Sequence, residues 1–156
     1  MQIAADHPAN VSILAYLGSC DPEHTIMSQS PESIEQVYLC VGTHPDIVER
    51  LWDTITVELP ASCRWVAYHW PVLVHPTTGI IFGFAQGSGA YALRLPPTER
   101  EQAIAAGAKR QYYFSTSKVT LDLDHIGDEW VIGLWSTEEP RWCLAAYSFA
   151  GQGGMA

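Results

Sequence analysis

Four short β-rich runs between residues 64 and 95, each ended by a turn signal, constrain the fold of this chain most. Pro71, the Pro-Thr-Thr-Gly segment 76–79 and the Gln-Gly-Ser-Gly segment 86–89 separate them. Runs of β-branched and aromatic residues with such spacing are typical of an antiparallel meander, in which strands that follow one another also pair. The four runs are residues 64–70, 72–75, 80–85 and 90–95.

Helical patterns lie on both sides of this meander. Proline and acidic residues suit the first turn of a helix, and an apolar stripe at helical spacing indicates the face that it buries. Gly107 favours the end of the helix expected over 98–106. The expected helices are 44–55, 98–106 with Thr98 as its cap, and 138–149.

Other segments are less strongly patterned. Residues 30–41 fit either a helix that begins at Ser30-Pro31-Glu32 or a buried strand over 37–41, and periodicity does not decide between them. Residues 54–59 are β-branched and alternating, which favours an extended segment. Two to three further strands are expected, at 111–115, 118–123 and 129–135.

These elements predict an α+β fold. We expect an antiparallel sheet of about five to seven strands, with three or four helices packed on one face or at the ends of the sheet. The length of 156 residues suits a single domain over 1–156. Within it, residues 1–30 read as an irregular lead-in and residues 151–156 as a flexible tail.

Charge narrows the class of partner. The formal net charge is −9, so lysines and arginines for phosphate contacts are scarce, and we expect neither nucleic acid nor a membrane as partner. Residues 1–58, 59–118 and 119–156 carry net charges of −8, +4 and −5. The apolar run 11–17 is too short to cross a bilayer and no basic residue precedes it, which favours a cytoplasmic protein.

Cofactor and metal motifs are not found in the sequence. The four cysteines form no close pair, so we expect no metal site and mostly buried thiols. Gly83, Gly87 and Gly89 fit a hairpin turn better than a phosphate loop, because a strand and not a helix follows them. We therefore expect no cofactor.

The leading functional hypothesis is a non-enzymatic protein-binding domain. An acidic surface around an aromatic anchor can steer and hold a basic protein, as an immunity or inhibitor protein does with its target. The six tryptophans belong mostly to the core or to an interface, and a minority of them could serve as such anchors. The residues expected to contact the partner are Asp122, Asp124, Asp128, Glu129, Trp135, Glu138 and Glu139.

Two alternatives stay open. The first is a small enzyme or ligand-binding domain whose pocket is assembled from His69, His75, Arg94 and Cys143, with Cys143 near a helix start where its thiol could be activated. A buried structural thiol is the simpler interpretation of Cys143. The second alternative is a subunit of a homo-oligomer, for instance a homodimer.

Overall fold

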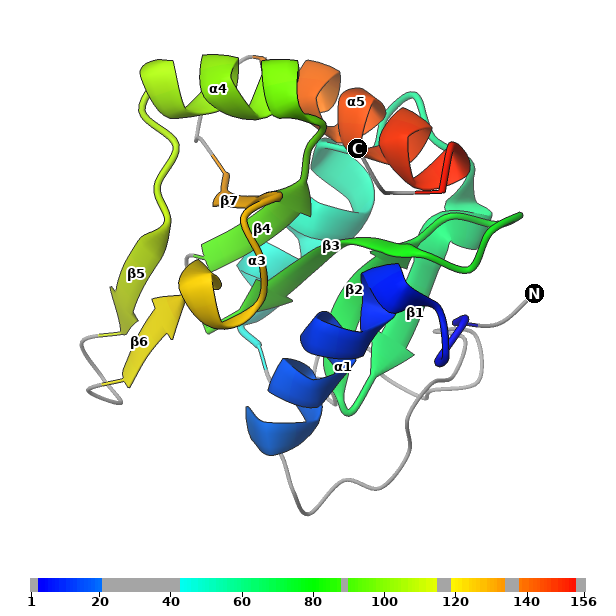
Figure 1. The fold of residues 1–156 in the computed structure, drawn as a ribbon, viewed down its shortest axis with the longest axis horizontal. Coiled ribbons are helices and arrows are strands. Elements are labelled where there is room, and N and C mark those ends of the chain that lie inside the picture. The colour runs from blue at the N-terminus through cyan, green and yellow to red at the C-terminus, as the bar shows by residue number, and fades with distance from the viewer. Residues whose placement is uncertain (1–2, 21–42, 88–89, 115–118, 134–137, 154–156) are drawn as a thin grey trace.

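The centre of the computed structural model is a five-stranded antiparallel sheet with the order β1-β2-β3-β4-β7 (Figure 1). The structure describes residues 3–20, 43–87, 90–114, 119–133 and 138–153. The first four strands pair in chain order, so the predicted meander is confirmed. Its first turn lies at Tyr68 and His69, however, and Pro71, expected to separate the first two strands, pairs with Val66 inside β2. The strands of this sheet are β1 (Arg64–Ala67), β2 (Trp70–Val74), β3 (Ile81–Gln86), β4 (Ala90–Arg94) and β7 (Trp130–Ile132).

A separate two-stranded sheet lies at the side of the main one (Figure 1, left). It consists of β5 (Gln111–Phe114) and β6 (Val119–Asp122), which pair antiparallel. Between β4 and β5 the chain makes a helix, and after β6 it returns to place β7 beside β4. Lys109 bonds to both backbone groups of Ile132 and so pairs with the outer edge of β7.

Helices cover both faces of the main sheet. On one face α3, η2, α4 and α5 bury a cluster that includes Leu51, Phe82 and Cys143. On the other face α1 buries Ile13 and Leu17 against Phe84. The helices are α1 (Pro8–Cys20), α3 (Pro45–Glu49), α4 (Pro97–Ala105), α5 (Glu139–Gly151), the π-helix η2 (Arg50–Thr54) and the short 3-10 helices η3 (Ala61–Cys63) and η4 (Leu123–His125).

The α+β class is therefore confirmed, with the difference that a helix covers the second face. That helix is α1, so the interpretation of residues 1–30 as an irregular lead-in is wrong for 8–20. Hydrogen bonds of one side chain attach α1 to the sheet. The buried side chain of Asn10 donates to the carbonyl oxygens of Ala4 and Gly79 and accepts from the Ile81 N–H, at 2.8–2.9 Å.

The predicted helices begin and end close to the expected residues. The first one continues as a π-helix from Arg50, and the chain makes turns over residues 55–58, so the expected extended segment 54–59 is wrong. The second begins at Pro97, and no side chain caps it, so Thr98 is not its cap. Gly107 follows it with a φ of 111°, as a helix stop requires.

Parts of three sequence predictions fall outside the described residues: the alternative over 30–41, residues 21–30 of the lead-in and residues 154–156 of the tail. In the described part of the chain, no helix has both the length and the apolar character needed to cross a membrane.

Candidate functional site

The acidic residues that follow β6 form a loop built around one guanidinium. We call residues 122–130 the acidic loop. Arg110 contacts the carboxylates of Asp124 at 2.7 Å and Asp128 at 3.8 Å. Its guanidinium also donates to the main-chain oxygens of Gly127 and Trp130, so it fixes the backbone as well as the carboxylates.

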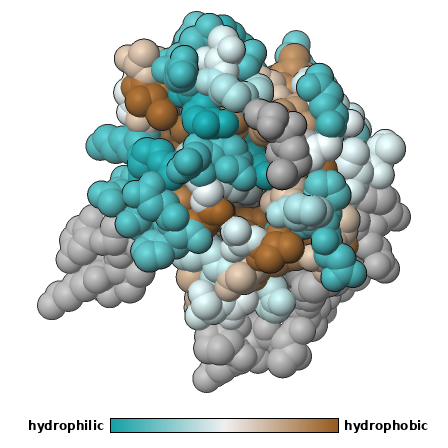
Figure 2. All heavy atoms as spheres, in the orientation of Figure 1, coloured by the Kyte–Doolittle hydropathy of each residue, from teal (hydrophilic) through white to brown (hydrophobic). Residues whose placement is uncertain are grey.

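The acidic loop presents its two arginine-bound carboxylates to solvent. The side chain of Asp124 is 67% exposed and that of Asp128 is 96% exposed. Asp124 lies in η4 and not on a strand, and the Asp122 carboxylate accepts from its N–H and so starts that turn. Figure 2 shows that hydrophilic residues gather over this part of the molecule.

The other predicted contact residues have different environments. Glu129 is half-buried and pairs with the buried guanidinium of Arg94 at 2.8 Å. Glu138 is exposed and lies 3.8 Å from Arg141. Trp135 lies outside the described residues. Only part of the predicted set is therefore available to a partner.

The prediction that Glu139 contacts a partner is wrong, because the side chain of Glu139 is fully buried. It accepts hydrogen bonds from the Arg50 guanidinium and from the Tyr91 hydroxyl, so π-helix, strand β4 and helix α5 meet at one carboxylate. The bond to Glu139 raises the pKa of Arg50, and burial, followed by Glu139, raises that of Tyr91. A carboxylate enclosed in this way stabilises the fold and cannot contact a partner.

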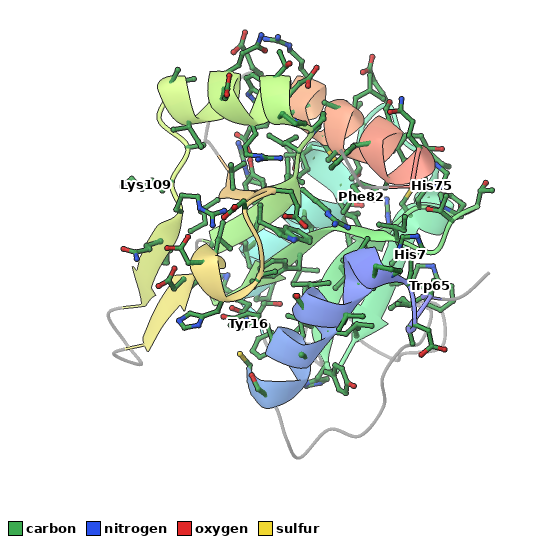
Figure 3. The ribbon with its side chains drawn as sticks, viewed as in Figure 1. His7, Tyr16, Trp65, His75, Phe82 and Lys109 are labelled. Atoms are coloured by element: carbon green, nitrogen blue, oxygen red, sulfur yellow. The ribbon has the colours of Figure 1, made fainter. Side chains whose placement is uncertain are left out.

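The structure does not bring together the alternative pocket of four residues. Arg94 bonds to the Ala9 carbonyl on the α1 face of the sheet, whereas Cys143 is buried in the cluster on the opposite face. His69 lies in the turn before β2 and His75 follows its end. Figure 3 shows His75 beside the C-terminal end of α5.

The side chains of Cys143 and His75 have the surroundings of structural residues. Burial raises the pKa of Cys143, which is the opposite of what an activated thiol requires. His75 packs against the Tyr147 ring with centroids 4.6 Å apart, and its Nδ1 accepts from the N–H groups of Thr77 and Thr78. The buried thiol is therefore the better interpretation of Cys143.

Most described tryptophans belong to the core, as expected. Trp52, Trp130 and Trp142 are buried. Trp130 is the last residue of the acidic loop and the first of β7, and its ring packs against Phe84 with 5.4 Å between the centroids. The ring is buried, so it anchors the end of the loop in the core and does not reach the surface.

Sequence reasoning missed the two arginines that organise these networks. Arg110 is 14 residues from Asp124, and Arg50 is 89 residues from Glu139. The sequence signal for Arg110 was that a basic residue precedes the first strand of a hairpin, β5, and acidic residues follow its second strand, β6. Arg50 gave no local signal at all.

The described residues include no group of three histidine, cysteine or acidic side chains that could hold a metal ion. Comparisons with protein-family models, with curated proteins and with solved structures gave no significant match.

Proposed function

We propose that this chain is a protein-binding domain that holds a basic partner through the acidic loop, in the manner of an inhibitor or immunity protein. The observation that carries the proposal is the set of bonds from Arg110 to the loop, which keep Asp124 and Asp128 exposed on a fixed backbone. A binding loop that is already ordered loses little conformational entropy when a partner docks.

Charge supports the same proposal. Asp122, Asp124 and Asp128 of the loop outnumber the one arginine that binds it, Arg110, and the net charge of −9 adds a long-range attraction for a cationic protein. Such attraction acts mainly on the association rate and weakens as salt is added. The partner is therefore expected to present lysines or arginines to the loop.

The test compares two doubly neutralised variants with the wild-type chain. Asp124→Asn/Asp128→Asn removes two charges from the loop and keeps side chains that can accept from Arg110. Asp6→Asn/Glu58→Gln is the matched control, because both of these acids are exposed and lie outside the loop. Proteins captured from extracts by each tagged form are identified, and the affinity of each purified candidate is measured at several salt concentrations.

A partner that binds the wild type and the control alike, but binds the loop variant at least about tenfold more weakly, supports the proposal. Its affinity for the wild type should fall as salt increases. Equal affinity for the wild type and the loop variant, or binding that does not change with salt, contradicts it.

A further inference from the structure

We propose that the outer edge of β5 binds an extended, basic segment of a partner protein, which adds a third strand to the two-stranded sheet. The inference deepens the proposed function and rests on it, because it states how the partner of the acidic loop binds. The surface lies where the edge of a strand and the carboxylates of the loop meet.

The backbone of β5 has an edge without a partner strand. The Leu123 N–H donates to the Arg110 carbonyl oxygen, so these two residues form a hydrogen-bonded pair at the start of the hairpin. Hydrogen-bonded and non-hydrogen-bonded pairs alternate along an antiparallel ladder, so the next residue, Gln111, directs its N–H and C=O away from β6. Gln111 is exposed, and no residue that the structure describes bonds to its backbone on that side. Figure 1 shows β5 as the outer strand of the pair, with β6 on the side of the main sheet.

Both edges of the main sheet are less accessible. Lys109 already pairs with the outer edge of β7 through both backbone groups of Ile132. At the opposite edge, Val66 and Ala67 of β1 are buried. Extended peptides add to sheets at an exposed edge, where backbone N–H and C=O groups are available to them. An extended segment can therefore reach β5 better than either edge of the main sheet.

The two faces of the hairpin determine the pattern of an added strand. Tyr112 and Leu121 lie opposite each other, and both pack against the hydrophobic cluster on the α1 side of the main sheet. The neighbouring pair, Gln111 and Asp122, lies on the other face because successive side chains of a strand alternate. An added strand would continue both faces, so apolar and polar residues should alternate along it.

Charge determines which polar residues the segment carries. The Asp122 carboxylate accepts from the side-chain amide of Gln111 at 3.3 Å, so it already extends toward β5. A lysine opposite Gln111 on the added strand has to cross one strand spacing of about 4.8 Å to approach this carboxylate. Asp124, which Arg110 holds at the same end of the hairpin, is 67% exposed. The segment that fits is extended, with lysine or arginine alternating with apolar residues.

A third strand would also stabilise the hairpin. β5 and β6 have four residues each and form a sheet of two strands. Two strands alone are marginally stable in water, whereas three strands with an apolar face can be stable. Binding is therefore expected to slow the hydrogen exchange of the hairpin amides, and that of Gln111 most directly.

The first experiment uses as probe a peptide of alternating lysine and valine, about eight residues long. NMR titration of the backbone amides should give saturable shifts at residues 109–114, and the Gln111 N–H should exchange at least about tenfold more slowly in the complex. A second peptide has the same sequence and charge but carries N-methyl groups on its two central residues, which removes one N–H from each of its edges. This peptide should bind at least about tenfold more weakly.

The second experiment changes the edge of β5. Gln111→Pro removes the N–H that points outward and leaves the hydrogen bonds between β5 and β6 in place. It should weaken binding of the lysine–valine peptide at least about tenfold. Gln111→Ala is the matched control, because it removes the same side chain but keeps the N–H, and it should bind the peptide more tightly than Gln111→Pro does. The amide spectrum of each variant establishes that the hairpin is folded.

The inference is overturned if the peptide gives no saturable shifts up to about 1 mM, or if the N-methylated peptide binds as tightly as its parent. Unchanged exchange of the Gln111 N–H in the complex also overturns it. The loop variant Asp124→Asn/Asp128→Asn separates this inference from the proposed function. If that variant binds the parent peptide about tenfold more weakly while N-methylation has no effect, strand addition fails and the proposed function stands. Equal binding by the loop variant and the wild type contradicts the proposed function and, with it, the basic character of the segment.

Discussion

Glu138 and Glu139 are neighbours in the sequence but have opposite environments in the structure. Both are acids at the start of α5, and both suit the first turn of a helix. A step of one residue turns the side chain by about 100° about the helix axis, so one faces solvent and the other faces Tyr91 and Arg50. The sequence could not tell them apart, because the arginine that encloses Glu139 comes from a distant helix.

Replacing Glu139 with Gln should lower the free energy of unfolding by about 3 kcal/mol, because the partly buried Arg50 guanidinium loses its counter-charge. Glu138→Gln, at the exposed neighbour, should cost less than about 0.5 kcal/mol. Urea unfolding measures both values. Equal effects of the two substitutions would show that Glu139 is not held as described.

His75 gives a prediction about pH. Burial lowers its pKa below the ordinary value of 6.5, and protonation would place a proton on the Nδ1 atom that accepts from Thr77 and Thr78. The unfolded chain therefore binds a proton more readily than the folded one. The contribution of His75 to stability is complete above about pH 6.5 and is lost as the pH falls from 6.5 toward the folded pKa.

His75→Asn keeps an acceptor for the turn and does not titrate. The free energy of unfolding, measured in urea between pH 7 and pH 5, should fall less steeply for this variant than for the wild type. His125→Asn replaces an exposed histidine and is the control for the loss of one imidazole. A His75→Asn slope equal to that of the wild type would contradict the prediction.

At the scale of elements, the strands of the meander were largely predictable, because turn residues specify the hairpins after β2 and β3 locally. The first turn was predicted at the wrong place: Tyr68 and His69 form it, and Pro71 lies within β2. Helix α1 was not, because Pro8 and Gly18 read as breakers. In the structure Pro8 occupies the first turn of the helix, and Gly18 gives room to the Tyr68 ring, which would lie 3.2 Å from an added Cβ. The glycine serves a contact between distant elements, which no local pattern reveals.

The π-helix was equally hidden. The apolar stripe from Ile47 to Ile55 fits an ordinary helix, yet the Ile55 N–H bonds to the Arg50 carbonyl five residues back. The indole N–H of Trp52 donates to Val72 on β2 at 3.0 Å. The π-helix therefore occurs together with a side-chain hydrogen bond from Trp52 to the sheet. The periodicity of the sequence does not indicate such a bond.

The attachment of α1 to the sheet can be tested at Asn10. Asn10→Ala leaves two carbonyl oxygens and the Ile81 N–H without this partner, and should cost about 2–3 kcal/mol. Hydrogen exchange of the α1 amides should rise more than that of β3. Ser12→Ala, at an exposed position of the same helix, should change stability by less than about 0.5 kcal/mol. Similar effects of both substitutions would contradict the described attachment.

At the scale of the whole molecule, the fold brings the positive middle segment of the chain against both negative segments. Ion pairs join Arg64 to Asp53, Arg94 to Glu129 and Arg110 to Asp124, so the positive middle of the chain is paired with both negative flanks. Three segments of alternating sign in the sequence therefore do not become separate charged faces. The acidic loop remains negative because its carboxylates outnumber its arginine.

Both faces of the main sheet should unfold together, because the same strands carry both hydrophobic clusters. Leu17→Ala on the α1 face and Leu51→Ala on the opposite face should each cost about 2–5 kcal/mol, since both leucines are fully buried. Tryptophan fluorescence reports on Trp130 and Trp52, one in each cluster, and circular dichroism reports on the helices. The two signals should give coincident transitions in each variant, and an earlier transition confined to one face would contradict this.

The place of α1 on the sheet has a kinetic consequence. Its bonds reach Gly79 and Arg94, across separations of 69 and 85 residues. During synthesis from the N-terminus, this helix leaves the ribosome long before the strands that it covers, and its leucines stay exposed until β3 has emerged. Contacts over such separations slow folding, so the docking of the first helix is a late event.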